Sequence, residues 1–228
     1  GSSYWGWVIC NEKISNNSIV YSCGVGEDIT FDLSMIQKYG VTIHAFDPTP
    51  RSIQWVKAQT LPHEFVLHEY GISNFDGHID FYPPVDPSHI SHTYIKREKT
   101  GGSPIRVPVR KLTTIMSKLG HEKIDLLKLD IEGAEYDVID DIISSRIQVG
   151  QVLIEFHHRF KEIGLDKTRD AIHKLNNHGY KLFDISDTLT EYSFIKSEWK
   201  RIAGYPRREV IELKRALITG ITGQDGSF

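Results

Sequence analysis

The sequence predicts an α/β fold in which a mostly parallel sheet carries helices on both faces. Short apolar runs typical of strands alternate with runs of helical periodicity, which favours parallel strands joined by helical crossovers. Several apolar runs also end in glycines or acids, the residues that bind ligands at the carboxyl edge of such a sheet. The expected strands are Ser18–Tyr21, Val41–Phe46, Glu64–Tyr70, Ile124–Leu129, Gln151–Phe156 and Tyr180–Ile185, and the expected helices are Ile29–Tyr39, Pro50–Gln59, Lys111–Leu119, Glu135–Ser144 and Lys167–His178.

The first two strands and the helix between them have the pattern of a nucleotide-binding unit. The run Ser18–Tyr21 is followed by Gly24-x-Gly26, whose glycines allow the backbone to approach a ligand closely. The run Val41–Phe46 ends at Asp47, a carboxylate placed to accept hydrogen bonds from both hydroxyls of a ribose. We therefore predict that a ligand containing a nucleoside binds where these two strands end.

Three residues at the start of the next helix indicate which nucleotide binds. Ile29 stands where a dinucleotide-binding fold has its third glycine, and Glu27 and Asp28 precede it. Carboxylates beside a helix N-terminus would repel the pyrophosphate that this terminus holds in NAD-binding proteins. S-adenosylmethionine has a ribose, no phosphate and a cationic sulfonium, so these acids favour it as the ligand.

A second group of chemically active residues follows the strand Ile124–Leu129. Strand alternation places Lys128 and Asp130 on one face, and Gly133 lets the chain turn into the next helix. Asp130 lies at a carboxyl strand end, as Asp47 does, so we expect both carboxylates in one crevice.

Four further residues near this crevice have competing interpretations. Glu132 and Glu135 either contribute to the site or only stabilise the helix N-terminus, an effect worth about 0.3–1 kcal/mol each. His157 and His158 end the strand that follows, and adjacent strand residues point to opposite sides, so at most one of them faces the crevice. A lone histidine is more often structural, but one beside Asp130 is equally a candidate for a catalytic role.

Composition narrows the possible functions. The chain has 228 residues, 39% hydrophobic and 25% charged, as expected for one globular domain with a substantial core. A net charge of −3 argues against a general nucleic-acid binder. Apolar runs of membrane-spanning length and a signal peptide are both lacking, so no membrane association is expected. The two cysteines have no disulfide or metal-knuckle spacing, which favours a reducing, cytoplasmic setting.

Three segments depart from the alternating pattern. Pro83 to Pro108 is rich in proline and glycine and is expected to be an irregular insertion, with a substrate lid as one interpretation. Residues 1–3 are typical of a cloning remnant, and residues 4–212 form the expected domain. Residues 213–228 contain a short apolar strand that runs into Gly220-x-x-Gly223-x-x-Gly226, so we expect a linker and the truncated start of a second domain.

The motifs together resemble the FkbM-type methyltransferases. The resemblance covers roughly Tyr4 to Ile195 and rests on the segments Tyr21–Asp28, Ala45–Arg51, Leu126–Tyr136, Ile154–His158 and Glu191–Ile195. It implies a class I methyltransferase fold, with seven strands of which the last is antiparallel, and S-adenosylmethionine as methyl donor. It also implies transfer to a hydroxyl, often of a sugar or a polyketide.

The residues that match the family's motifs form the expected site. The cofactor is expected to contact Cys23, Gly24, Val25, Gly26, Glu27, Asp28, Asp47, Pro48, Gly71 and Ile72, and the expected catalytic residues are Asp130, His157 and Glu132. Many relatives have Asp-x-Gly-Ala-Asn where this chain has Tyr21-Ser-Cys-Gly-Val. Any role of the missing acid would therefore pass to Glu27 or Asp28.

The function predicted from the sequence is a methyl transfer from S-adenosylmethionine to a sugar hydroxyl. Asp130 and His157 either take the hydroxyl proton or hold a divalent ion that lowers its pKa, and the sequence does not decide between these mechanisms. The tail from Lys214 resembles the opening of an extended short-chain dehydrogenase, similar to GDP-mannose 4,6-dehydratase, which indicates a bifunctional polypeptide and a nucleotide sugar or glycan acceptor. The alternatives are a dinucleotide-dependent oxidoreductase and a non-catalytic binding module with the same fold.

Overall fold

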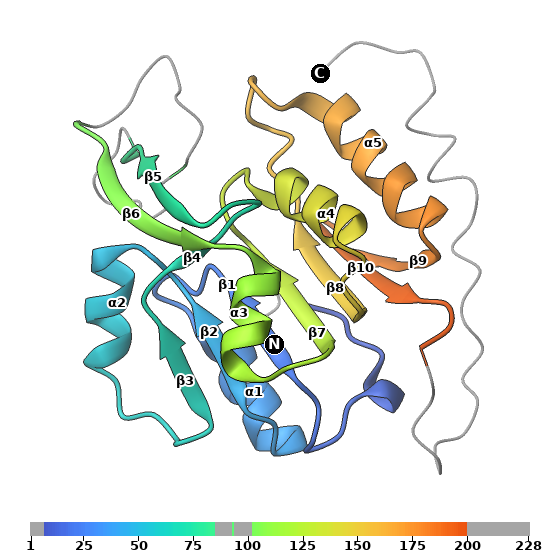
Figure 1. Cartoon of the computed structure of the whole chain (residues 1–228), viewed down its shortest axis with the longest axis horizontal. Coiled ribbons are helices and arrows are strands. Elements are labelled where there is room, and N and C mark those ends of the chain that lie inside the picture. The colour runs from blue at the N-terminus through green and yellow to red at the C-terminus, as the bar shows by residue number, and fades with distance from the viewer. Residues whose placement is uncertain (1–6, 85–92, 94–101, 200–228) are drawn as a thin grey trace.

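The computed structural model describes residues 7–84, 93 and 102–199. Its centre is a seven-stranded sheet with the order β3-β2-β1-β7-β8-β10-β9, in which only β10 runs antiparallel to its neighbours (Figure 1). The strands are β1 (Val20–Cys23), β2 (Ile43–Phe46), β3 (Phe65–His68), β7 (Ile124–Leu129), β8 (Val149–Glu155), β9 (Tyr180–Ile185) and β10 (Glu191–Lys196). The expected α/β architecture, with an antiparallel last strand, is confirmed.

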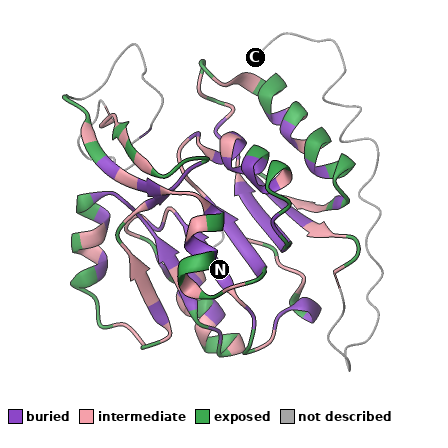
Figure 2. Ribbon diagram, viewed as in Figure 1, coloured by how far each residue is buried: buried purple, intermediate pink, exposed green. Residues whose placement is uncertain are grey.

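Helices cover both faces of this sheet. One apolar cluster packs α3, α4 and α5 against one face, and a second cluster packs α1 and α2 against the other. The central strands β1, β7 and β8 are buried, and the outer faces of the helices are exposed (Figure 2). The helices are α1 (Thr30–Tyr39), α2 (Pro50–Lys57), α3 (Leu112–Leu119), α4 (Glu135–Ser144) and α5 (Gly164–Asn177), and a short 3-10 helix, η1, spans Asn11–Lys13.

A second, three-stranded sheet was not predicted from the sequence. It has the order β4-β6-β5, with β4 at Gly71–Ile72, β5 at Gly77–Phe81 and β6 at Ile105–Arg110. The expectation of an irregular segment up to Pro108 is therefore wrong for residues 105–108. Pro108 is compatible with the strand because it has a neighbouring strand on one side only. β5 pairs along the whole of β6 up to Val109, whereas β4 on the other side pairs only with Val109 and Arg110.

Several sequence-based expectations fall outside the described residues. These are the cloning remnant at residues 1–3, most of the proposed lid at 85–92 and 94–101, and the tail at 200–228. Among the residues that the structure does describe, no helix is both long and apolar enough to span a bilayer.

Aromatic and imidazole rings gather on the α3 side of β1, β2 and β3. His44 Nδ1 lies 3.1 Å from His68 Nε2, and the Tyr21 hydroxyl lies 2.8 Å from Nδ1 of His121. Burial, reinforced by the neighbouring imidazoles, lowers the pKa of His44 from 6.5 to about 4. Burial also lowers the pKa of His68 and of His121.

We expect this cluster to make the domain sensitive to acid. The folded protein keeps His44 neutral while the unfolded chain takes up a proton near pH 6.5, so His44 costs stability as the pH falls from 6.5 to about 4. Between pH 7 and pH 5 we expect the parent to lose about 1–2 kcal/mol more free energy of unfolding than His44→Phe loses. Urea unfolding at both pH values measures this difference, with the exposed His63→Gln as the control. An equal loss of unfolding free energy in the parent and in His44→Phe would contradict the lowered pKa of His44 in the folded protein.

Candidate active site

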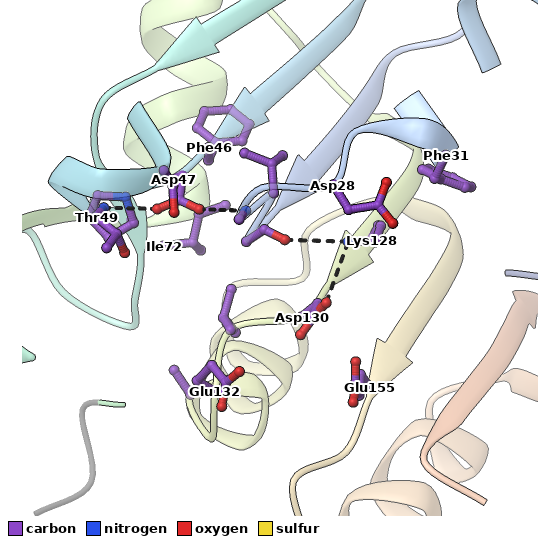
Figure 3. Close-up of a pocket in the computed structure, with 18 of the residues that line it drawn as sticks. Asp28, Phe31, Phe46, Asp47, Thr49, Ile72, Lys128, Asp130, Glu132 and Glu155 are labelled. Carbon is purple, nitrogen blue, oxygen red and sulfur yellow. Dashed lines mark hydrogen bonds and ion pairs between the residues drawn. The ribbon is translucent and has the colours of Figure 1, made fainter. Parts of the chain in front are cut away.

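A cleft of about 1460 Å³ opens at the carboxyl edge of the large sheet, where the small sheet adjoins it. Figure 3 shows Asp47 and Thr49 on one side of this cleft, Glu155 on the other and Asp130 between them. The small sheet contributes apolar side chains from β5 and β6 to the cleft wall. Nine of the ten residues expected to contact the cofactor line it: Gly24, Val25, Gly26, Glu27, Asp28, Asp47, Pro48, Gly71 and Ile72.

Cys23 is the expected residue that does not line the cleft. Its side chain is fully buried in the apolar cluster on the α3–α5 face, and burial raises the pKa of its thiol. Its backbone still contributes, because its carbonyl accepts a 3.0 Å hydrogen bond from the amide of Asp130. Cys23 therefore joins β1 to the end of β7 and does not present its thiol to a ligand.

The glycine turn after β1 requires glycine for two different reasons. Gly24 has a φ of 78°, and a Cβ there would lie only 1.7 Å from the carbonyl oxygen of Asp130. Gly26 has a φ of 56°, but a Cβ there would meet no atom within 4 Å. Gly24 thus allows the turn to pack against β7, and Gly26 leaves space at the cleft wall.

The carboxylate of Asp47 is held in place by backbone amides on both sides. Gly26 N donates to Asp47 Oδ2 at 3.0 Å, and Thr49 N donates to Asp47 Oδ1 at 2.8 Å. Asp47 is only 4% exposed, so these bonds offset part of the cost of burying its charge. Each oxygen has a further lone pair with which it can accept a ligand hydroxyl.

The two acids at the start of α1 differ in their partners. Glu27 forms an ion pair with Arg51 of α2, with 2.7 Å between Oε1 and Nε. Asp28 is exposed, and its Oδ1 accepts a hydrogen bond of 2.9 Å from Thr30 N in the first turn of α1. Both line the cleft, so the start of α1 places two carboxylates at the cleft wall.

Lys128 and Asp130 project from the end of β7 into the cleft, as the strand alternation predicted. Lys128 Nζ lies 3.8 Å from Asp130 Oδ2, 3.4 Å from the carbonyl oxygen of Gly24 and 5.1 Å from the centre of the Trp7 ring. Burial raises the pKa of Asp130, and the positive charge of Lys128 opposes this shift. Lys128 therefore links the glycine turn to the acid at the centre of the cleft.

His157 lies between two carboxylates. Its Nδ1 is 2.9 Å from Glu135 Oε1, and its Nε2 is 3.4 Å from Glu132 Oε2. Burial alone would lower the pKa of His157, but the charge and hydrogen bond of Glu135, with the charges of Glu132 and Asp130, raise it to about 10. The imidazole is therefore protonated at neutral pH, so it is a poor proton acceptor in this state.

Glu132 has an unusual backbone conformation for a glutamate. Its φ is 54°, in the left-handed region that residues other than glycine rarely adopt. Thr93, from within the Pro83–Pro108 segment, donates a hydrogen bond of 2.8 Å to the carbonyl of Glu132. The turn that carries Glu132 into the cleft is thus fixed by a residue distant in the sequence.

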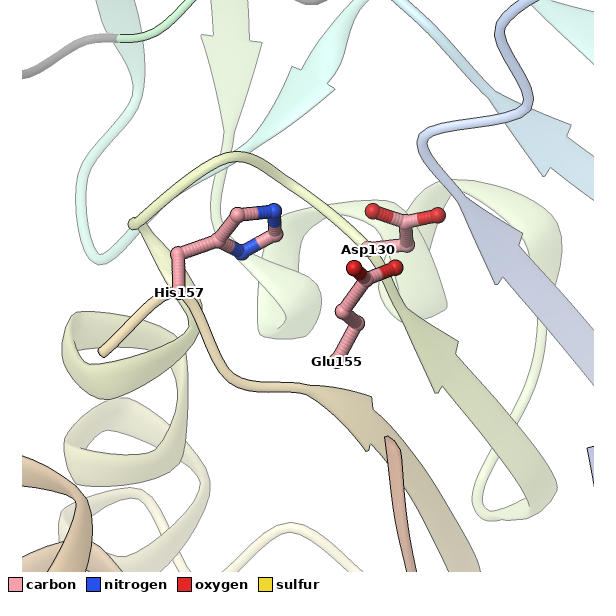
Figure 4. A group of neighbouring side chains, drawn as sticks. All are labelled: Asp130, Glu155 and His157. Carbon is pink, nitrogen blue, oxygen red and sulfur yellow. The ribbon is translucent and has the colours of Figure 1, made fainter. Parts of the chain in front are cut away.

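Glu155 is a cleft residue that sequence reasoning missed. It ends β8, and one of its carboxylate oxygens lies within 4.8 Å of ligand atoms of both Asp130 and His157 (Figure 4). Burial and the negative charge of Asp130 raise the pKa of Glu155 to about 8. Its spacing of two residues from His157 at the end of a strand was the available signal, because residues i and i+2 share a face.

The sequence profile described as "Methyltransferase FkbM domain" matches residues 12–182. The chain belongs to this family. The matched range contains the glycine turn, Asp47, Asp130 and His157, so the FkbM domain includes the whole polar part of the cleft. S-adenosylmethionine is the methyl donor that this membership implies.

The FkbM domain is similar to two curated proteins whose names describe methyltransferases. It is 33% identical to "Probable methyltransferase-like protein 24" of Rattus norvegicus over 141 residues, which are 60% of this chain and 32% of that protein. It is 29% identical to "2-O-methyltransferase NoeI" of Sinorhizobium fredii over 135 residues, which are 51% of this chain and 53% of that protein. The chain thus spans about a third to a half of the length of these relatives.

Among solved structures, the FkbM domain is similar to the fibrillarin pre-rRNA processing protein of Methanococcus jannaschii. The TM-score is 0.49 at 10% sequence identity, and the match covers 84% of this chain and 71% of the fibrillarin chain.

Proposed function

We propose that this domain transfers a methyl group from S-adenosylmethionine to a hydroxyl of a sugar, nucleotide sugar or glycan. The observation that carries the proposal is that one cleft holds both parts of such a site. The glycine turn and Asp47 lie on one side of the cleft, and Glu155 lies on the other with Asp130 between them. The buried His157, which does not line the cleft, lies close to both acids. S-adenosylmethionine held by the glycine turn and Asp47 would direct its methyl group toward Asp130 and its neighbours.

The residues around the glycine turn and Asp47 fit S-adenosylmethionine. Gly26 leaves open space along the cleft wall, and the Asp47 carboxylate is fixed by two amides and retains acceptor capacity for a ribose diol. The carboxylates of Glu27 and Asp28 favour a cationic ligand and disfavour a pyrophosphate. This electrostatic argument favours the methyl donor over the dinucleotide of an oxidoreductase.

When bound, S-adenosylmethionine supplies an electrophilic methyl group, whose bond to sulfur breaks as its bond to the acceptor oxygen forms, with the electron pair passing to sulfur. The protein must align the acceptor oxygen with this bond and remove the hydroxyl proton. Asp130 is the residue to which we assign the proton, because His157 is already protonated at neutral pH. The imidazolium then stabilises the negative charge that develops beside it.

Oxygen as the acceptor atom is supported by the relative named "2-O-methyltransferase NoeI". A sugar is supported by the FkbM resemblance and by the tail from Lys214, whose Gly220-x-x-Gly223-x-x-Gly226 pattern resembles the start of a GDP-mannose 4,6-dehydratase. We infer that the natural polypeptide is bifunctional and that its second domain makes or modifies a nucleotide sugar.

The Asp47 assignment predicts a loss of cofactor affinity. Hydrogen bonds to a charged acceptor are worth about 1.5–3 kcal/mol, so Asp47→Ala should weaken binding of S-adenosylhomocysteine roughly ten- to a hundredfold. Calorimetric titration measures this, with Asp140→Asn on the exposed face of α4 as the control. Because Asp47 also holds the turn at Gly26, a circular dichroism spectrum must establish that the variant is folded. Parental affinity in a folded Asp47→Ala would contradict the ribose assignment.

The acceptor is tested by incubating the chain with labelled S-adenosylmethionine and three panels: GDP-sugars, glycans and hydroxyl compounds that are not sugars. We expect label in one or more members of the first two panels. Transfer only to the third panel would contradict the sugar assignment. Tight cofactor binding with no transfer to any panel would favour a non-catalytic module with this fold.

A further inference from the structure

We propose that Asp130, Glu155 and His157 bind a divalent transition-metal ion, for which Mn²⁺ is the probe. The three residues lie at or just after the ends of β7 and β8, and each offers one ligand atom close to those of the other two (Figure 4). Asp130 and Glu155 line the cleft, and His157 is buried beside them. The proposal rests on the proposed function for its catalytic role but not for the binding of the ion.

The spacing of the ligand atoms is close to that of a metal site. All three lie within 4.8 Å of one another. Two ligands on one ion are at most about 4.5 Å apart, because each metal–ligand bond is about 2.0–2.3 Å long. A small rotation of the Asp130 or Glu155 side chain therefore completes the set, and both residues are only partly buried.

A fourth residue orients the imidazole as in known metal sites. Glu135 is fully buried, and its Oε1 accepts hydrogen bonds from the amides of Ile131 and Gly133 at 3.0 and 3.2 Å. The same oxygen lies 2.9 Å from Nδ1 of His157 and accepts a hydrogen bond from it. A carboxylate on one imidazole nitrogen is the usual device that directs the other toward a metal. We therefore assign Nε2 of His157 as the ligand, and its proton must pass to the solvent when the ion binds.

The charge of the cluster also favours a cation. Four carboxyl groups, those of Asp130, Glu132, Glu135 and Glu155, surround His157, and Lys128 is the nearby amine. When these carboxyl groups are ionised they outnumber the cations of His157 and Lys128, and repulsion between carboxylates is strong in a partly desolvated cleft. A divalent cation would neutralise this excess.

The ligand set indicates the class of ion and its role. Two carboxylates and one imidazole suit Mn²⁺ and its neighbours better than Mg²⁺ or Ca²⁺, which take oxygen ligands almost alone. Three protein ligands leave positions open for the acceptor hydroxyl, whose pKa the ion would lower. With Asp130 engaged by the ion, the hydroxyl proton passes to Glu132, and the oxygen then forms its bond to the methyl carbon as the bond to sulfur breaks.

Calorimetric titration of the metal-stripped full chain with MnCl₂ tests the site directly. We expect saturable binding of one ion and a higher melting temperature in its presence. Glu155→Gln and His157→Gln should each weaken binding at least about tenfold, because each removes one ligand. Asp28→Asn, which alters a carboxylate elsewhere in the same cleft, and His158→Gln should bind Mn²⁺ as the parent does.

The outcomes separate this proposal from the proposed function. Saturable binding that is lost in the two ligand variants supports the metal site, even if no sugar accepts a methyl group. Absence of saturable binding, or parental affinity in both folded ligand variants, overturns it. Methyl transfer that is unaffected by a chelator overturns the catalytic role of the ion, while leaving the methyltransferase assignment intact.

Discussion

Asp130→Asn is expected to lower the rate of methyl transfer by a factor of about 10²–10⁴, because it removes either the positioned proton acceptor or, with a metal bound, one of the ligands of the ion. The substitution keeps the size of the side chain but removes its charge, and Asp130 is the acid at the centre of the cleft. His157→Ala should have a similar effect, because it removes the cation beside the reacting oxygen or, with a metal bound, one of its ligands.

Both Asp130→Asn and His157→Ala should retain the parental affinity for S-adenosylhomocysteine within a few-fold. Single-turnover transfer from labelled S-adenosylmethionine measures the rate, and calorimetry measures the affinity. Asp140→Asn, on the exposed surface of α4, is the control and should transfer at the parental rate. Parental rates in both Asp130→Asn and His157→Ala would contradict their catalytic assignment and direct attention to Glu132 and Glu155.

Gly24→Ala is expected to cause the largest loss of stability. Its Cβ would lie 1.7 Å from the backbone oxygen of Asp130, and its φ of 78° is unfavourable for alanine. Strain of this kind costs about 1–2 kcal/mol and overpacking about 1–3 kcal/mol more, so we expect a loss of about 3 kcal/mol. The midpoint of urea unfolding measures it.

Gly26→Ala is the matched control for Gly24→Ala. Its φ of 56° is also left-handed, but its Cβ would meet no atom within 4 Å, so it should cost only about 1–2 kcal/mol. The added methyl group lies at the cleft wall, so we expect the free energy of cofactor binding to fall by more than the free energy of unfolding does. Equal destabilisation by the two variants would show that the turn relaxes away from β7.

The sequence predicts the large sheet well because its strands are short apolar runs, and the segments between most of them have the periodicity of amphipathic helices. The bounds of β7, α4 and β9 agree with those expected. The small sheet escaped prediction because prolines around β6 indicate a loop, and whether a strand tolerates proline depends on its neighbours. That information is not local in the sequence.

The site is predictable to the extent that strand ends determine it. Asp47 and Asp130 lie at the carboxyl edge, as alternation and the βαβ pattern require. The sequence does not indicate that Glu135 and Glu132 enclose His157 and keep it protonated, because this depends on tertiary distances. It also left the roles of Glu132 and Glu135 open between helix stabilisation and the site.

The central claim is that the cleft beyond β1 and β2 binds S-adenosylmethionine. Calorimetric titration of the full chain with S-adenosylhomocysteine, and in parallel with NADPH, tests it most directly. We predict binding of one S-adenosylhomocysteine per chain and no measurable binding of NADPH. Binding of NADPH without binding of S-adenosylhomocysteine would contradict the claim and restore the oxidoreductase interpretation.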